Sequence, residues 1–567
     1  MIKPLLSAIL VSCFLILATG TAVLAQLPRY VISFTDKKNT PYQLGAPEQY
    51  LSPAAIQRRQ RQQINIDSTD LPVTPAYVDS ILRAGNVTVL YTSRWFNQVI
   101  IQTNDASALQ KINGFPFVKT TMPAAQRLAP GPAIAPGKLS ETVDSGNIPL
   151  LRSTAADYYG NAFDQIHLHE GEYLHNKGKR GAGMIIAILD AGFSGVGDNK
   201  AFAQLRNQQQ LIATHNFTDN TTEVFDFGTH GAFCLSALTA YLPGQMVGTA
   251  PEAEYVLFRT EENGMEQPIE EHNWIAAAEM ADSIGVDVIS SSLGYNLFDN
   301  PDYNHTYSQL DGKTTIIAQA AALAVRKGMI VVNAAGNEGN HPWKYLLTPA
   351  DADSVLTVAA VDKALQVATF SGYGPTADGR IKPDVAGLGV GTVLVNTDGT
   401  LTSGNGTSYA TPVLAGLVTC LWQAFPHRTN MDILRAVKAC SSQYRQPDYR
   451  IGYGIPNFRA AYDTLLKMEL QDTAYIRQTL DNHPVKAFPN PFNDQLRIYY
   501  KASANLQIML ELMDAAGRIV RKRSLPAVDM NYGYFNWQDG LSSLPAGVYY
   551  LRVIQGTVKS TLKLVKL

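Results

Sequence analysis

A serine that could act as a nucleophile lies in the turn Gly406-Thr407-Ser408, directly before an apolar helical stretch, 413–418. Backbone N–H groups and the positive end of a helix dipole at such a position favour formation of an oxyanion. A serine hydroxyl is a poor nucleophile without a base, so it also needs a histidine that is oriented by a carboxylate. A Gly-Thr-Ser turn is common, and its meaning therefore depends on the segments that accompany it.

Three upstream segments supply possible partners. The apolar run 184–189 ends in Asp190, which predicts a buried parallel strand with the carboxylate at its carboxyl end. His230 opens a helix of small residues, where one ring nitrogen can face a carboxylate and the other a hydroxyl. Asn337 follows the predicted strand 328–332, and its amide could donate to an oxyanion beside the Ser408 N–H.

These segments, in the order Asp, His, Ser, resemble the subtilisin-like serine proteases, or subtilases. The resemblance implies that Asp190, His230 and Ser408 form the catalytic triad and that Asn337 donates to the oxyanion. It further implies two substrate-binding segments, an edge that pairs with extended substrate backbone and the opposing wall of a specificity pocket. These are Ser292-Leu293-Gly294 and Ala334-Ala335-Gly336, and the sequence does not give the depth of the pocket.

The chain departs from the family pattern near the triad. Ala191 stands where relatives often carry Thr or Ser, so one hydrogen bond that supports this turn is expected to be missing. Ala232 stands where Thr is usual. Cys234 lies one helical turn after His230, which makes a thiol nucleophile conceivable, but a buried cysteine more often packs as a hydrophobe. We expect core packing, and none of these changes removes an atom that transfers a proton.

The rhythm of apolar strands and helical stretches from 155 to 466 predicts an α/β domain, a doubly wound and mostly parallel sheet of the subtilisin-like type. Residues 26–123 show a small α+β pattern that resembles the family's inhibitory propeptide; the alternative is a separate binding domain. Residues 124–154 are rich in Ala, Pro, Gly and Ser, which predicts an exposed linker. We expect the enzyme to cut itself there or shortly after.

Both ends of the chain indicate export. Residues 1–25 carry a basic start, a short apolar stretch and a small-residue cleavage site, as in a secretory signal. After a second linker at 467–484, the short strands and turns of 485–567 predict a small β-sandwich. The strings 489–492 and 544–551 resemble the C-terminal sorting domain of type IX secretion; a carbohydrate- or protein-binding module is the alternative.

Composition excludes some classes of function. The chain of 567 residues has 46 basic and 48 acidic residues, which gives no electrostatic case for a nucleic-acid partner. The run 57–61 is interpreted as a solvated helix face. Removal of the signal leaves three cysteines. Cys420 and Cys440 could pair, but so sparse and odd a count does not indicate a disulfide framework. Relatives often bind structural calcium, but the acids of 219–226 lack a recognisable ligand spacing and are interpreted as solvated.

Together these patterns predict a secreted or cell-surface serine endopeptidase, made as a zymogen, that needs no cofactor for its chemistry. Its expected partners are protein or peptide substrates, its own propeptide and, through the C-terminal domain, the secretion machinery. A catalytically inactive surface protein that uses the same fold for binding is the alternative. The sequence does not separate a dedicated processing enzyme from one that degrades bulk protein.

Overall fold

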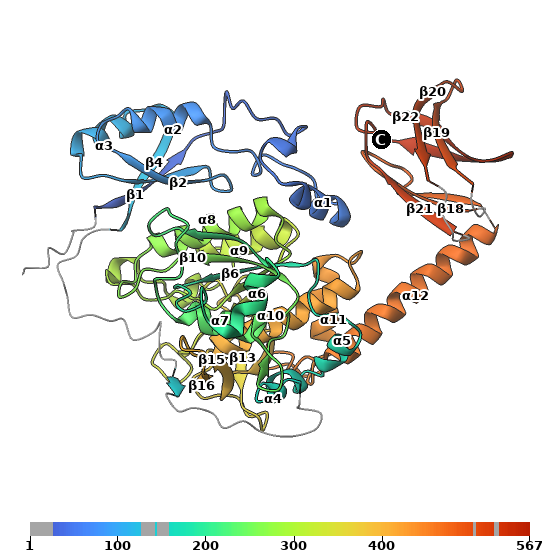
Figure 1. The fold of residues 1–567 in the computed structure, drawn as a ribbon. Coiled ribbons are helices and arrows are strands. Elements are labelled where there is room, and N and C mark those ends of the chain that lie inside the picture. The colour runs from blue at the N-terminus through green and yellow to red at the C-terminus, as the bar shows by residue number, and fades with distance from the viewer. Residues whose placement is uncertain (1–26, 126–141, 145–157, 483, 503–505, 527–531) are drawn as a thin grey trace, which may run out of the picture. The chain divides into compact units, whose positions relative to one another are not determined.

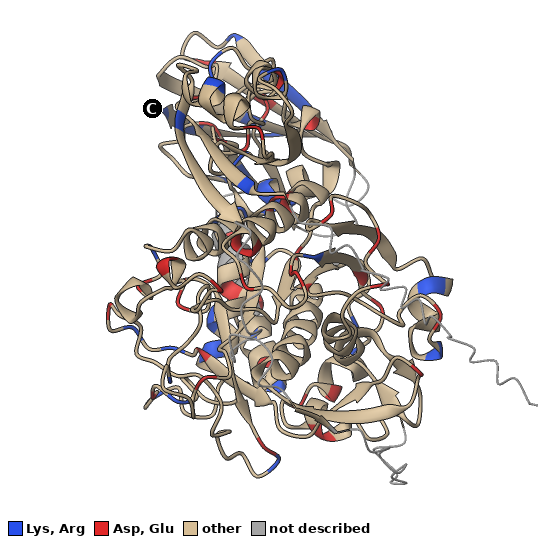
Figure 2. Cartoon of the chain, turned by 90° about the vertical axis from the view of Figure 1, so that its left-hand side faces the viewer, with Lys and Arg blue, Asp and Glu red and all other residues tan. Residues whose placement is uncertain are grey.

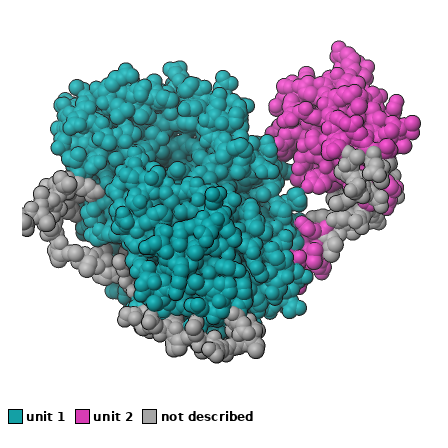
Figure 3. All heavy atoms as spheres, viewed as in Figure 1, with its two compact units in different colours: residues 1–459 teal, residues 460–567 magenta. Residues whose placement is uncertain are grey.

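The computed structural model describes residues 27–125, 142–144, 158–482, 484–502, 506–526 and 532–567 (Figure 1). The predicted signal at 1–25 and most of the predicted linker at 124–154 lie outside the described residues. The chain divides into two compact units, residues 1–459 and 460–567 (Figure 3). Figure 2 shows Lys and Arg interspersed with Asp and Glu along the chain, as expected from the balanced composition.

A seven-stranded sheet forms the centre of the first unit, in the order β14-β13-β12-β11-β6-β10-β7, and every neighbouring pair is parallel. This confirms the predicted fold class. The strands are β6 (Ile185–Asp190), β7 (Leu211–Asn216), β10 (Glu254–Arg259), β11 (Val288–Ser291), β12 (Ile330–Ala334), β13 (Leu356–Val361) and β14 (Val385–Leu388). Strand order reverses beside β6, and ligand sites of such sheets lie at the carboxyl ends near this reversal.

Helices cover both faces of this sheet. On one face α8 (Ile269–Ile284) and α9 (Ile316–Arg326) bury a core with the sheet that includes Trp274, Ile289 and Val331. On the other face α10 (Thr407–Ala424) packs across β11 to β14 and against α7 (His230–Thr239). The shorter helices are α4 (Phe163–His167), α5 (Glu172–Asn176), α6 (Ala203–Asn207) and α11 (Asn430–Ala439). Burial on both sides explains why the strands consist of continuous apolar runs.

A small sheet lies beside the segment that leads into α10. Strands β15 (Thr392–Val395) and β16 (Leu401–Asn405) form an antiparallel pair, and β5 (Thr142–Asp144) adds to the other edge of β16. Three residues of the predicted linker are thus attached to the peptide that ends just before Gly406. A further hairpin joins β8 (Tyr241–Leu242) and β9 (Met246–Val247).

The N-terminal part, residues 27–125, is an α+β domain with its own core. Its antiparallel sheet has the order β2-β3-β1-β4, and its core joins strands to helices through residues such as Ile32, Ile81 and Ile112. The elements are β1 (Arg29–Phe34), α1 (Pro53–Gln62), α2 (Pro75–Leu82), β2 (Thr88–Ser93), β3 (Gln98–Gln102), α3 (Ala106–Asn113) and β4 (Val118–Ala125). The predicted small α+β domain is confirmed, with β4 continuing two residues beyond the predicted boundary at 123.

The interpretation of residues 57–61 as a solvated helix face is wrong. The run lies on α1, where Arg58 and Arg59 are only 2% and 1% exposed. Both guanidiniums enter ion pairs with Asp282 of α8. The helix therefore presents its arginines to another part of the same unit instead of to water.

The second unit is a β-sandwich preceded by a long helix. Sheets β17-β18-β21 and β20-β19-β22-β23 enclose a core that includes Phe492, Trp537 and Leu551, as predicted for this region. Its strands are β17 (Val485–Phe488), β18 (Leu496–Lys501), β19 (Ile508–Asp514), β20 (Ile519–Leu525), β21 (Tyr532–Trp537), β22 (Gly547–Gln555) and β23 (Val558–Lys566). The predicted linker at 467–484 is mostly helical, because α12 (Phe458–Asn482) runs through it.

Two further findings concern the cysteines and the membrane. No disulfide joins Cys420 and Cys440, so the suggested pairing is wrong; instead the Cys420 thiol donates to the Thr249 carbonyl over 3.2 Å. Among the described helices, none combines the length and the hydropathy that a membrane span requires.

Candidate active site

The carboxylate and the imidazole meet where β6 ends and α7 begins. Asp190 is the last residue of β6 and fully buried, and His230 is the first residue of α7. His230 Nδ1 donates to Asp190 Oδ1 over 2.6 Å. Gly231 allows this approach, because a Cβ there would lie 2.5 Å from the Gly192 carbonyl oxygen and 2.9 Å from Asp190 Cβ. The imidazole is therefore held in one orientation by a buried anion.

Asp190 is itself fixed by the backbone. Its Oδ1 also accepts from the Ala191 N–H over 2.7 Å. Within the described part of the chain, no donor reaches the other oxygen, Oδ2, which is buried as well.

Ser408 is the second residue of α10 and 3% exposed. The first N–H groups of a helix lack partners within the helix, so the Ser408 N–H lies at a position suited to an oxyanion. The Ser408 hydroxyl donates to the Ser292 carbonyl over 3.3 Å, and the Ser292 hydroxyl donates to the Ser408 carbonyl over 2.8 Å. These two bonds tie the start of α10 to the segment that follows β11.

Cys234 contacts both the ring of the histidine and the backbone carbonyl of the serine, whose hydroxyl donates to Ser292. Its sulfur lies 4.0 Å from each ring nitrogen of His230 and donates to the Ser408 carbonyl over 3.5 Å. The residue is fully buried and packs with Tyr409 and Val413, as expected for a core cysteine. Asp190, His230 and Cys234 also form a group whose ligand atoms lie within 4.8 Å of one another. Two of its three members are already joined by the hydrogen bond described above.

The amide of Asn337 is oriented by the residue before the serine. Its Oδ1 accepts from the backbone N–H of Thr407 over 2.9 Å and from the Thr407 hydroxyl over 3.0 Å. Because the carbonyl oxygen of the amide faces Thr407, the NH₂ group is directed away from Thr407. The Gly336 N–H donates to the Thr407 hydroxyl over 3.2 Å, which fixes the chain on both sides of the amide.

The two segments predicted to bind substrate follow neighbouring strands. Ser292-Leu293-Gly294 continues β11, and Ala335-Gly336 continues β12, of which Ala334 is the last residue. Asn333 bridges them, because its amide donates to the Leu293 carbonyl over 3.0 Å. Asn333 and Thr407 were not predicted as site residues. A buried asparagine within the apolar run 330–334 was the available signal for the former.

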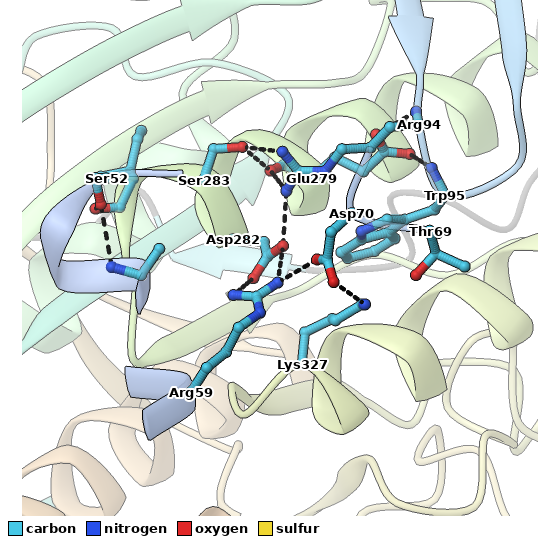
Figure 4. A network of polar contacts seen from close by, with 12 residues as sticks. Ser52, Arg59, Thr69, Asp70, Arg94, Trp95, Glu279, Asp282, Ser283 and Lys327 are labelled. Atoms are coloured by element: carbon cyan, nitrogen blue, oxygen red, sulfur yellow. Dashed lines mark hydrogen bonds and ion pairs between the residues drawn. The ribbon is translucent and has the colours of Figure 1, made fainter. Parts of the chain in front are cut away.

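The N-terminal domain is bound to α8 through Glu279. This carboxylate accepts from the Ser93 hydroxyl over 2.5 Å and from the N–H groups of Arg94 and Trp95 over 2.7 and 3.2 Å (Figure 4). Burial raises the pKa of Glu279 to about 7, although the neighbouring Arg94 lowers it. The turn after β2 is thus capped by a side chain of the opposite domain.

A network of buried charges forms the second contact between the two domains. Asp282 accepts from Arg59 over 2.8 and 3.0 Å and from Arg94 over 2.7 Å (Figure 4). Arg59 also donates to Asp70 over 2.6 Å, and Asp70 accepts from Lys327 over 2.7 Å. Burial alone would raise the pKa of Asp282, but the surrounding arginines more than offset this, so its pKa lies below the ordinary value.

Two of the acids considered for calcium, Asp219 and Glu223, have protein donors. Asp219 accepts from the Asn216 amide over 3.0 Å and lies 3.4 Å from the Arg259 guanidinium. Glu223 accepts from the Phe225 N–H over 2.6 Å. The guanidinium of Arg259 supplies the positive charge at Asp219.

A histidine bonded to a buried aspartate, a serine at a helix start and an oriented amide lie together at the carboxyl edge of a doubly wound sheet, as in the serine-hydrolase class. Comparison with known families specifies it. Residues 181–454 match the model of the subtilase family, residues 29–137 the peptidase S8 propeptide domain of Bacteroidota, and residues 486–567 the secretion system C-terminal sorting domain. Residues 181–454 thus form a subtilisin-like serine peptidase domain between a propeptide domain and a sorting domain, and the sorting domain marks the chain as secreted or cell-surface.

Individual relatives agree. The chain is 29% identical to a thermophilic serine proteinase of Bacillus sp. (strain AK1), over 50% of this chain and 62% of the relative. It is 28% identical to subtilisin of Bacillus pumilus, over 51% of this chain and 94% of the relative. Among solved structures, fervidolysin from Fervidobacterium pennivorans aligns with a TM-score of 0.53 at 18% identity, covering 93% of this chain and 71% of that one. This last likeness supports the fold.

Proposed function

We propose that the chain is a secreted endopeptidase that hydrolyses peptide bonds through Asp190, His230 and Ser408, and that it is made as a zymogen. The observation that carries the proposal is the 2.6 Å hydrogen bond between His230 and the buried Asp190, next to the start of α10. A histidine in this state can accept a proton while the carboxylate stabilises the imidazolium that forms.

The first half-reaction forms an acyl-enzyme. His230 takes the proton of the Ser408 hydroxyl as the oxygen attacks the peptide carbonyl carbon. The Asn337 amide and the Ser408 N–H donate to the oxygen that becomes negative. His230 then gives the proton to the leaving amine, and the C–N bond breaks.

The second half-reaction releases the acid. A water molecule gives a proton to His230 and attacks the ester carbon, and the same two donors stabilise the second tetrahedral intermediate. His230 returns the proton to the Ser408 oxygen as the ester bond breaks. This chemistry needs no cofactor.

The remaining domains fit a secreted zymogen. The N-terminal domain, bound at Glu279 and Asp282, acts as the enzyme's own inhibitor until it is cut off. The C-terminal domain engages the secretion machinery. Substrates are proteins or peptides that bind in extended form along Ser292-Leu293-Gly294.

Labelling with a fluorophosphonate probe tests the proposal. The wild-type chain should label, the Ser408→Ala variant should not, and the Ser290→Ala variant should label like wild type, since Ser290 is a buried serine within β11. Equal labelling of wild type and Ser408→Ala would assign the nucleophile to another residue. Absence of labelling in all three would favour the alternative, an inactive binding protein.

A further inference from the structure

One leucine lies between the two segments proposed to bind substrate. A Cβ at Gly294 would lie 2.5 Å from Leu347 Cβ, and a Cβ at Gly336 would lie 2.7 Å from Leu347 Cγ. Real Cβ atoms do not approach other carbons this closely, so Leu347 occupies the space that both glycines leave open. Its side chain therefore fills the slot between the segments after β11 and β12.

The backbone of Leu347 is held from both walls of this slot. Its N–H donates to the Ala335 carbonyl over 3.1 Å. The next residue, Thr348, exchanges two backbone hydrogen bonds with Tyr295, over 2.8 and 3.2 Å. The side chain of Leu347 is 5% exposed. A leucine fixed in this way cannot move aside with a flexible loop.

Both glycines that Leu347 contacts lie close in the chain to residues of the proposed reaction. Gly336 directly precedes Asn337, the proposed oxyanion donor, and Ser292, two residues before Gly294, accepts from the Ser408 hydroxyl. A peptide carbonyl placed between Ser408 and Asn337 therefore brings the residue before the scissile bond to the mouth of the slot. The side chain of that residue has to enter the space that Leu347 partly occupies.

We infer that Leu347 makes this pocket shallow and restricts cleavage to peptides with a small residue, Gly, Ala or Ser, before the scissile bond. The inference rests on the proposed function. Adding carbon atoms to a close-packed site forces neighbouring side chains and backbone to shift, which is unfavourable. A bulky residue such as Phe or Leu at this position therefore lowers kcat/KM, because it displaces the substrate backbone from the serine.

Peptides that differ only in the residue before the scissile bond test the inference on the full chain after it has matured. Wild type should cleave the Ala peptide at least about 10-fold faster, in kcat/KM, than the Phe peptide, since a mismatch of one methylene already changes this ratio about 10- to 200-fold. Leu347→Ala should raise the Phe/Ala ratio at least about 10-fold. Leu347→Val should give a smaller increase.

Leu346→Ala is the matched control. Leu346 is 1% exposed and packs with Ala335 and Ala350, so its truncation costs core packing without opening the slot. Its Phe/Ala ratio should equal that of wild type. Fluorophosphonate labelling of each variant establishes that its site has folded. If Leu347→Ala does not label, the Phe/Ala ratio of Leu347→Val tests the inference instead.

Three results would overturn the inference. One is a wild-type enzyme that labels and prefers Phe or Leu before the cut. Another is an unchanged Phe/Ala ratio in the labelled Leu347 variants. A wild-type chain that neither labels nor cleaves any peptide would refute the proposed function, and the inference with it; the first two results leave the proposed function intact.

Discussion

Asn337 owes its orientation to two hydrogen bonds from Thr407, one from the backbone and one from the hydroxyl. An amide held in this way needs no rearrangement when the carbonyl oxygen becomes negative, and preorganised donors of this kind are a large part of enzymatic rate enhancement. The neighbouring serine and its oxyanion donor are thus fixed by the same residue.

Replacing Asn337 with Ala should lower kcat about 10²- to 10³-fold, the size of effect that the loss of this donor has in subtilisin. KM should change little, because the donor acts on charge that develops only after binding. Steady-state kinetics on a small-residue peptide measures both constants. A loss that falls mainly on KM would show that Asn337 binds the ground state.

The separation of His230 from Asp190 depends on how closely α7 approaches β6. Cys234 and Gly231 determine this approach. Cys234 contacts the imidazole from within the core, and Gly231 has no room for a side chain. Residues that transfer no proton therefore set the distances among those that do.

At the scale of elements, helix α1 is the feature that sequence reasoning misjudged. Arg58 and Arg59 look like part of a solvated face because their partner Asp282 lies more than 220 residues further along the chain. By contrast, strands β6 and β3 can be recognised in the sequence, because each forms a local run of apolar residues. Local patterns predict elements, and long-range ion pairs decide which polar faces are buried.

In the site, too, residues in local motifs could be predicted from the sequence, and residues that matter through long-range contacts could not. Asp190, His230 and Ser408 each stand in a short motif that can be recognised without coordinates. Leu347 stands in no such motif, and Thr407 stands in one only as the neighbour of Ser408. The importance of both comes from contacts with Gly294, Gly336 and Asn337. The helical character of 467–482 was missed because a polar composition is typical of linkers and of exposed helices alike.

Arg59 lies at the centre of the buried ion network, and Arg59→Ala should weaken docking of the propeptide domain strongly. The change leaves Asp70 and Asp282 less compensated, and breaking a buried ion pair costs about 3–5 kcal/mol. Arg83→Ala is the control, because its pair with Asp79 is exposed and such pairs contribute about 0–1 kcal/mol. Thermal unfolding of both variants in the Ser408→Ala background measures the difference. Equal melting temperatures would contradict the assignment.

Glu279 should make this docking depend on pH. Its pKa rises from the ordinary 4.5 to about 7 when the carboxyl is buried beneath the propeptide domain, so the docked state binds the additional proton. The docked state is therefore favoured below pH 4.5, loses stability as the pH rises from 4.5 to about 7, and changes no further above that. Neutral pH thus favours release of the propeptide.

The comparison of Glu279 with Glu279→Gln isolates this contribution, because other titrating groups are common to both chains. In the Ser408→Ala background, the melting temperature of the Glu279 chain relative to the Gln chain should fall between pH 4.5 and 7 and then level off. A constant difference across this range would show that Glu279 keeps an ordinary pKa in the docked state.

At the scale of the whole molecule, two units with separate cores share one chain. Units of this kind unfold as independent cooperative transitions unless a large interface joins them. Calorimetry of the full Ser408→Ala chain should therefore show more than one transition. A chain that ends at residue 484 should lose the transition of the β-sandwich and keep the others within about 2 °C. A shift of the remaining transitions would indicate that the units stabilise each other.

The segment that we expect to be cut lies in the chain between two described elements of the first unit, β4 and β5. The propeptide domain ends with β4 at Ala125, and the chain is attached again at β5, which pairs with the strand just before Gly406. A bond between these anchors belongs to the same molecule as the serine, so its cleavage is intramolecular and gains the advantage of high effective concentration. The wild-type chain should therefore acquire a new N-terminus within 124–154 or shortly after, at a rate that does not depend on protein concentration. The Ser408→Ala chain should stay intact, and N-terminal sequencing distinguishes the two.

Processing that proceeds equally in Ser408→Ala would assign the cut to another protease, and a rate that rises with concentration would assign it to cleavage between molecules.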